Sequence, residues 1–129
     1  EPFVTDGTPG GTRLLADLNP GNVSSHPAAF AVALGTVLMR AQRTGTGAEL
    51  FASDGTVAGS GLLVDLSQDR GDASPSPLVA LGGTLLFAAT DDTGNTLAWR
   101  SDGSTAGTSP LGLFARVRPG RPRGRLRTR

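Results

Sequence analysis

The sequence contains no Cys, no Lys, no Tyr and no Ile, and it has only one His, one Met and one Trp among 129 residues. Without Cys, the chain has no disulfide framework, no thiolate zinc site and no Cys nucleophile. A single His and no Tyr leave few groups for acid–base catalysis. A P-loop for nucleotide binding has no support, because that motif requires Lys. No apolar run approaches the roughly 20 residues that a membrane-spanning helix needs.

The charges that are present are distributed unevenly along the chain. Residues 1–115 contain five Arg and eleven acidic residues, a balance of −6, whereas residues 116–129 contain seven Arg and no acid, a balance of +7. The formal net charge of +1 is therefore the sum of an acidic body and a basic tail.

The tail, residues 115–129, is a low-complexity segment rich in Arg, Pro and Gly. Such like-charge segments are disordered and often contact nucleic acid or anionic surfaces, so we expect no fold here. Two other interpretations stay open: a flexible end, or a terminus produced by a shifted reading frame. The candidate polyanion contacts are Arg116, Arg118, Arg121, Arg123, Arg125, Arg127 and Arg129.

A 48-residue repeat organises the chain up to about residue 114. The string TDGTPGGT at 5–12 returns as SDGTVAGS at 53–60 and as SDGSTAGT at 101–108. We therefore divide residues 1–114 into units 1–48, 49–96 and a partial unit 97–114. Units of this length are typical of repeat architectures, in which each copy is one small supersecondary structure.

Within one unit the sequence predicts short strands and no helix. In the second unit the apolar runs 49–53, 61–66, 78–81 and 84–90 are separated by Asp, Gly, Ser and Pro. Runs of that length with such breaks indicate all-β structure. Four strands in a 40–50-residue period are typical of a β-propeller blade.

The recurring strings ELFASDGTVAGS, GLLVDL and GGTLLFAA resemble the ELWxxDGT repeat family, whose units read roughly GGTLYFxAxD…GxELWxSDGTxxGTxLVxDI. The similarity covers residues 1 to about 114, although the third copy has Leu97 where the others have Glu1 and Glu49. The resemblance implies a propeller-like repeat array in a large, exported bacterial protein. It supplies no catalytic residue and no cofactor.

The Asp-Gly-Thr motif allows two interpretations. Asp6, Asp54 and Asp102 could bind Ca²⁺, but that ion takes six to eight oxygen ligands and each loop offers one acid. Alternatively, the Asp accepts hydrogen bonds from backbone N–H groups two residues on, Gly supplies a positive φ, and the Thr hydroxyl assists. We expect a structural turn, and no metal site, at Asp6, Gly7, Thr8, Asp54, Gly55, Thr56, Asp102 and Gly103.

Two further sets of polar residues invite a functional reading. Asp17 and Asp65 lie inside apolar strands, and because a buried unpaired carboxylate is costly, we expect each to face backbone N–H groups, an Arg or solvent. His26 stands where the second unit has Ser74, and one imidazole builds neither a metal site nor a Ser-His-Asp triad. We expect His26 to be exposed.

Phe3, Phe51 and Trp99 occupy one position of the repeat. Our prediction is that they form the core between neighbouring blades; the alternative is an exposed aromatic ledge for a sugar.

The predicted architecture is an open, all-β, propeller-like array of about two and a half four-stranded antiparallel blades, with a half blade at the start. Propellers typically need four to eight blades to close, so we expect a fragment of a longer array or an assembling protomer, with open blade edges that invite self-association. The expected function is a non-enzymatic scaffold, exported or on the cell surface, that binds a protein or glycan. The alternative is polyanion binding through the tail, and a hydrolase is a distant third.

Overall fold

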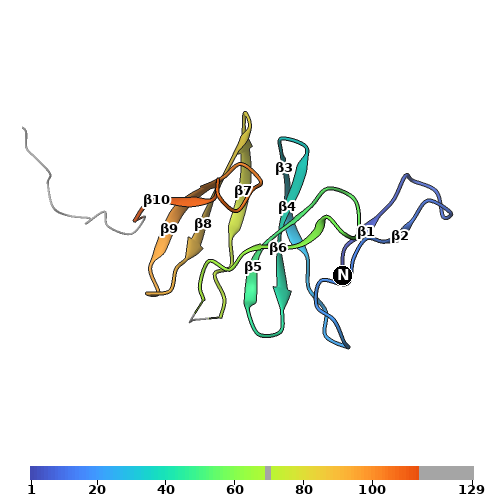
Figure 1. Cartoon of the computed structure of the whole chain (residues 1–129), viewed down its shortest axis with the longest axis horizontal. Helices are drawn as coiled ribbons and strands as arrows, with labels where there is room; N and C mark the ends of the chain where they lie inside the picture. The colour runs from blue at the N-terminus through green and yellow to red at the C-terminus, as the bar shows by residue number, and fades with distance from the viewer. Residues whose placement is uncertain (69–70, 114–129) are drawn as a thin grey trace, which may run out of the picture.

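The computed structural model describes residues 1–68 and 71–113, which form strands and the turns between them (Figure 1). The strands are β1 (Phe3–Val4), β2 (Arg13–Leu14), β3 (Ala28–Ala33), β4 (Thr36–Arg43), β5 (Gly47–Ser53), β6 (Ser60–Val64), β7 (Ser76–Leu81), β8 (Thr84–Thr90), β9 (Thr96–Ser101) and β10 (Ser109–Leu113). The all-β prediction is confirmed, and the runs predicted in the second unit match β5 to β8 to within two residues at each end.

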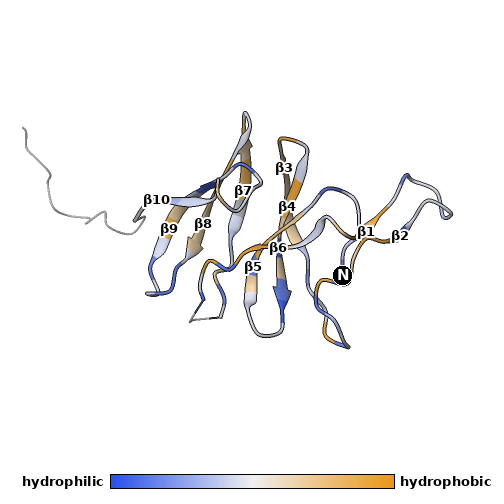
Figure 2. Ribbon diagram, viewed as in Figure 1, coloured by the Kyte–Doolittle hydropathy of each residue, from blue (hydrophilic) through white to orange (hydrophobic). Residues whose placement is uncertain are grey.

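The strands form three antiparallel sheets, none of them closed on itself. The first sheet is β1-β2, the second is β3-β4-β5-β6, and the third is β7-β8-β9-β10. The three sheets follow one another along the long axis of the molecule (Figure 1). Apolar residues concentrate on the strands and polar ones in the connections (Figure 2).

The second and third sheets have the same internal register. Val37 pairs with Ser53 between β4 and β5, and Leu85 pairs with Ser101 between β8 and β9, each position 48 residues after its counterpart. A β-bulge interrupts the pairing of β3 with β4, and another interrupts that of β7 with β8 at the equivalent place. The sequence repeat is therefore a repeat of sheet geometry.

Each four-stranded sheet takes two strands from one 48-residue unit and two from the next. The four strands predicted within unit 49–96 do not form one sheet, because β5 and β6 belong to the second sheet and β7 and β8 to the third. The reason is the connection between β6 and β7, residues 65–75, which contains Pro75 and is much longer than a two-residue hairpin turn.

The core lies between the sheets, in two clusters. The cluster between the second and third sheets contains Leu38, Leu50, Leu85, Phe87 and Trp99. The cluster between the first and second sheets contains Leu15, Leu18, Met39, Ala41 and Phe51. The strands β4 and β5 thus bury one set of alternate side chains against each neighbouring sheet, because successive residues of a strand point to opposite faces.

The β3–β4 hairpin turns through Leu34 and Gly35, which have φ of +50° and +80°. Two central residues of positive φ are typical of a type I′ turn, which favours Asn-Gly. Leu34 is 73% exposed. At the equivalent position of the β7–β8 hairpin stands Gly82, with φ of +62°.

The described residues include no helix with the length and apolar character needed to span a membrane.

Candidate functional site

The loop between β5 and β6 is held together by its own side chains. Oδ1 of Asp54 accepts hydrogen bonds from the backbone N–H of Thr56 at 2.9 Å and from its hydroxyl at 2.7 Å. The Thr56 hydroxyl oxygen accepts a further hydrogen bond from the N–H of Gly59 at 2.9 Å. Gly55 has φ of +95°, a conformation that L side chains rarely adopt.

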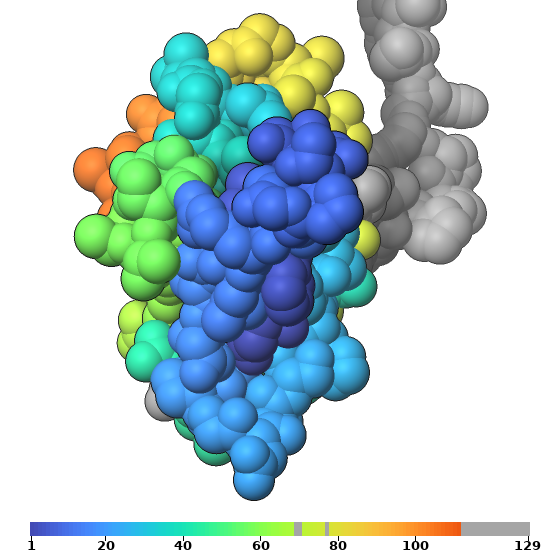
Figure 3. All heavy atoms as spheres, turned by 90° about the vertical axis from the view of Figure 1, so that its right-hand side faces the viewer, coloured from blue at the N-terminus to red at the C-terminus, as the bar shows by residue number. Residues whose placement is uncertain are grey.

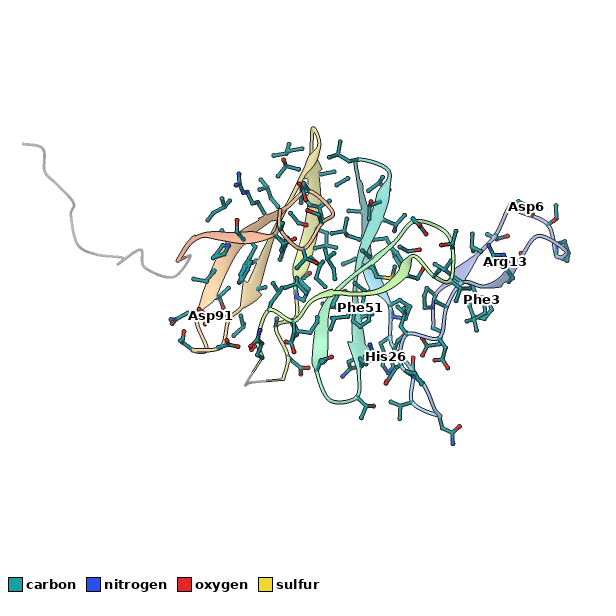
Figure 4. All side chains as sticks on the ribbon, viewed as in Figure 1. Phe3, Asp6, Arg13, His26, Phe51 and Asp91 are labelled. Carbon is teal, nitrogen blue, oxygen red and sulfur yellow. The ribbon has the colours of Figure 1, made fainter. Side chains whose placement is uncertain are left out.

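The same loop is built in all three sheets, and we call residues 5–12, 53–60 and 101–108 the DGT loops. In the first, Asp6 accepts from the N–H and hydroxyl of Thr8 at 2.9 and 2.7 Å. In the third, Asp102 accepts from the N–H and hydroxyl of Ser104 at 2.9 and 2.6 Å. Figure 4 shows Asp6 on the loop at one end of the molecule.

The second Gly of the motif is required because the Asp carboxylate leaves no room there for a Cβ atom. A Cβ at Gly59 would lie 2.1 Å from Oδ1 of Asp54, and the distances are 2.0 Å from Gly11 to Asp6 and from Gly107 to Asp102. Real Cβ atoms do not approach an oxygen so closely. The spacing of Asp and Gly by five residues therefore follows from the way the carboxylate folds back over the loop.

Hydroxyl pairs close each DGT loop at its base. The hydroxyl oxygens of Ser53 and Ser60 lie 2.7 Å apart, and the Ser53 oxygen also accepts a hydrogen bond from the N–H of Gly55. The equivalent pairs are Thr5 with Thr12 at 2.6 Å and Ser101 with Thr108 at 2.7 Å. The signal for this pair was present in the sequence as a Ser or Thr at both ends of every motif.

These contacts give the three Asp residues a structural use. Hydrogen bonds from the side chain and the backbone of residue i+2 lower the pKa of Asp6, Asp54 and Asp102 below the ordinary value, so the carboxylates stay ionised near neutral pH. In the part of the chain that the structure describes, no three His, Asp or Glu side chains are grouped in a way that could hold a metal ion. The contacts support the turn interpretation.

A groove with a volume of about 400 Å³ lies beside the second DGT loop. One wall is the third DGT loop, because Thr105 Oγ1 donates a hydrogen bond to the Leu63 carbonyl at 3.0 Å and Gly103 lies against Thr36. Its lining is mostly small and includes Asp54, Ala58, Gly59, Ser60, Gly61 and Gly103. At this groove two successive DGT loops and the strand β6 meet around an open space.

Glu49 on β5 is the acidic side chain that the motif analysis missed. It is fully buried, with Oε2 accepting from the N–H of Leu66 at 2.7 Å and Oε1 from the N–H of Ala73 at 3.1 Å. Glu1 makes the equivalent contact with the N–H of Leu18 at 2.6 Å. The carboxylate therefore ties a strand to the long connection that leads into the next sheet.

Burial raises the pKa of Glu49 to about 7, with the nearby charge of Asp65 adding to the effect and the backbone hydrogen bonds opposing it. The recurrence of Glu at positions 1 and 49 was the available signal. Its N–H donors lie 17 and 24 residues further along the chain, so they could not be predicted from local spacing.

The aromatic repeat position is buried in two copies of three. Figure 4 labels the first two copies, Phe3 and Phe51. Phe51 is 0% exposed and Trp99 is 9% exposed, and Trp99 stacks on Phe87 with ring centroids 6.3 Å apart. The core prediction is confirmed for these two. It is wrong for Phe3, which is 66% exposed because no described residue covers the outer side of the first sheet.

The remaining polar candidates are not brought together. Asp17 is exposed, in agreement with one of the three surroundings expected for it. Asp65 is half-buried, and its Oδ1 has no hydrogen-bond partner among the described residues. The neighbouring backbone N–H of Leu66 donates to Glu49 and not to Asp65. His26 is exposed, as expected, with φ of +45°, and Ser74 at the equivalent position has φ of +47°.

The Arg-rich tail with its predicted contacts, Arg116 to Arg129, lies outside the described residues.

No protein-family model, no curated protein and no solved structure matches this chain.

Proposed function

We propose that this chain is a non-enzymatic binding scaffold, an open propeller-like array of about two and a half blades of the ELWxxDGT repeat type. In this proposal the second and third sheets are blades and the first sheet is a half blade. Support comes from the face-to-face packing of antiparallel four-stranded sheets with a 48-residue period. By the resemblance alone, we place the protein outside the cell or on its surface.

The observation that carries the proposal is one loop built three times, with the same side-chain hydrogen bonds to Asp but with different residues at its tip. The tips are Pro9-Gly10, Val57-Ala58 and Thr105-Ala106, all exposed. A constant frame with variable exposed positions suits recognition, since binding residues are commonly presented on loops that a rigid scaffold positions.

The chemistry of the described residues supports binding in preference to catalysis. The Asp side chains of the DGT loops and the buried Glu49 are occupied by backbone hydrogen bonds, and they recur between repeats. Active sites combine unlike groups at one place, such as a nucleophile, a base and an orienting group. We therefore propose that no reaction is catalysed here.

The groove beside the second DGT loop is the proposed contact site for a glycan or a peptide. Small residues make up most of its lining, and Asp54 and Ser60 add polar groups to it. Backbone groups and a few polar side chains in a concave surface are the usual means by which small sites fix the orientation of a ligand.

The test is an array of bacterial glycans and synthetic peptides probed with the full chain and two variants. Ala58→Arg places a long side chain at the groove, and we expect it to abolish binding of any ligand that the wild type retains. Thr44→Arg, at an exposed position of the β4–β5 turn that does not line the groove, is the matched control and should bind as the wild type does. No ligand for the wild type, or equal loss in both variants, would contradict the proposal.

A second candidate function rests on the charge of residues 116–129, seven Arg without an acid. Binding of nucleic acid or heparin through this tail is dominated by phosphate or sulfate charge and falls with salt. Removal of residues 116–129 should abolish retention on heparin if the tail is the binding element. Retention of the shortened chain at the same salt concentration would exclude it.

A further inference from the structure

The outer face of the third sheet carries an apolar cluster, with Arg100 beside Leu86 on the same face, and none of the described sheets packs on it. Its side chains surround a shallow hollow of about 330 Å³ whose lining is entirely apolar, and they come from β7, β8, β9 and β10. Val79 is 47% exposed and Leu111 is 56% exposed. The residues that line this face include Val79, Leu86, Ala88, Ala98 and Leu111.

The equivalent face of the second sheet shows what such a surface packs against. Leu38 and Leu50, 48 residues before Leu86 and Ala98, are fully buried under the third sheet. The side chains that cover them are those of Leu85, Phe87 and Trp99. This face of a sheet is therefore built to receive the aromatic-bearing face of the sheet that follows it.

The opposite end of the molecule exposes an unused face of the complementary kind. Phe3 and Leu14 pair with each other across the first sheet and are 66% and 44% exposed. Their equivalents, Phe51 and Leu62, also pair, and they pack toward the first sheet in the second core cluster. Figure 3 looks onto this end, with the first sheet in blue at the front.

We propose that a second copy of this chain docks here head to tail, its first sheet on the outer face of the third sheet. The junction would repeat between chains the packing that occurs twice within the chain, with Phe3 of one copy over Leu86 and Ala98 of the other. The inference rests on the stacked-sheet part of the proposed function and is independent of any ligand of the loops.

A head-to-tail junction uses different surfaces on the two partners, so association does not stop at a dimer unless a ring closes. It also removes the exposed apolar side chains at both ends from water, and this burial favours association. The first sheet has only two strands, and we expect a weaker junction than the one between the second and third sheets.

The experiment is sedimentation velocity on the full chain from low micromolar to near millimolar concentration. The wild type should increase in mean mass with concentration. Phe3→Glu and Val79→Glu each remove one of the two faces and should each stay monomeric. An equimolar mixture of the two should contain a two-chain species and nothing larger, because it retains one intact pair of faces.

Val57→Glu, a substitution of an exposed residue on the second DGT loop, is the matched control and should associate like the wild type. Circular dichroism checks that each variant is folded, and Phe3→Ser and Val79→Ser replace any that is not. A wild type that stays monomeric throughout would overturn the proposal. So would association of Phe3→Glu alone, or association that appears only after residues 114–129 are removed. The glycan and peptide array tests binding at the DGT loops, whereas sedimentation tests association of the chains. A negative result in one experiment is therefore distinguishable from a negative result in the other.

Discussion

Glu49 and Asp54 lie five residues apart on one hairpin, yet their surroundings shift their pKa values in opposite directions. Asp54 is exposed, and hydrogen bonds from the Thr56 side chain and backbone lower its pKa. Glu49 is fully buried, and desolvation raises its pKa to about 7 even though it accepts backbone hydrogen bonds. Both carboxylates accept hydrogen bonds, so the opposite shifts of their pKa values come from their different access to water.

These shifts predict how the free energy of unfolding depends on pH. The raised pKa of Glu49 stabilises the folded chain fully below its ordinary value of 4.5, and this contribution is lost as the pH rises through about 7. The lowered pKa values of Asp6, Asp54 and Asp102 stabilise the folded chain above their ordinary value of 3.8. This contribution is lost as the pH falls below that value. Urea unfolding should show greatest stability in mildly acidic solution and a decrease on the order of 2 kcal/mol towards about pH 8.

The variant Glu49→Gln separates this effect from others. It should have a stability close to that of the wild type in acid, because Gln resembles the protonated carboxyl that a pKa of about 7 implies, and it should lose the decrease above neutrality. Glu1→Gln changes the equivalent residue, whose pKa is lowered because the hydrogen bonds it accepts and the nearby N-terminal charge outweigh its desolvation. It should retain the decrease. A wild type whose stability is flat between about pH 5 and about pH 8 would contradict the assignment.

A second prediction at this scale concerns the close approach of Gly59 to Asp54. Gly59→Ala forces the carboxylate out of its contacts with Thr56, and we expect a loss of about 1–2 kcal/mol of stability. Gly61→Ala, where a Cβ would meet nothing within 4 Å, should change stability by less than about 0.5 kcal/mol. In an Asp54→Ala background the Gly59→Ala substitution should become harmless. An unchanged cost in that background would show that the carboxylate is not the obstacle.

Among the elements, the β3–β4 hairpin is the place where sequence and conformation disagree. Leu34 is held at φ of +50°, which costs roughly 1–2 kcal/mol for a residue with a Cβ. Leu34→Asn creates the Asn-Gly pair that type I′ turns favour, and it sacrifices little burial because Leu34 is 73% exposed. Chemical unfolding should show a gain of about 1 kcal/mol.

Leu34→Ala is the control for this hairpin. It removes the contact of the Leu34 side chain with Gly83 but keeps the strained backbone, so it should be less stable than Leu34→Asn. Equal stability of the two variants would mean that backbone strain does not limit this turn.

The strands and turns could be predicted from sequence because their signals are local. An Asp, a Gly and a hydroxyl residue at fixed offsets define each DGT loop, and apolar runs between such loops define the strands. The assignment of strands to sheets was not local, since it depended on the length of the 65–75 connection. The role of Glu49 could not be predicted for the same reason: its partners at Leu66 and Ala73 are brought near only by the packing of two sheets.

On the scale of the whole molecule, identical sequence positions acquire different surroundings from their place in the stack. Phe51 is fully buried because the first sheet lies beside it, and Phe3 is exposed because nothing described covers it. Phe30 and Val32 on β3 are each 56% exposed, since the first sheet has two strands where the second and third have four. Repetition in sequence predicts the unit of structure, but only the neighbours decide which copies are core.

The junction of the second and third sheets holds the one Trp of a chain that has no Tyr. Trp99 is 91% enclosed there and stacked on Phe87, so intrinsic fluorescence observes a single site of the array. Separation of the second and third sheets alters the emission of this indole directly, whereas detachment of the first sheet leaves its surroundings untouched. Trp99 fluorescence therefore reports on the interface between the second and third sheets, and it does not report on the interface between the first and second sheets.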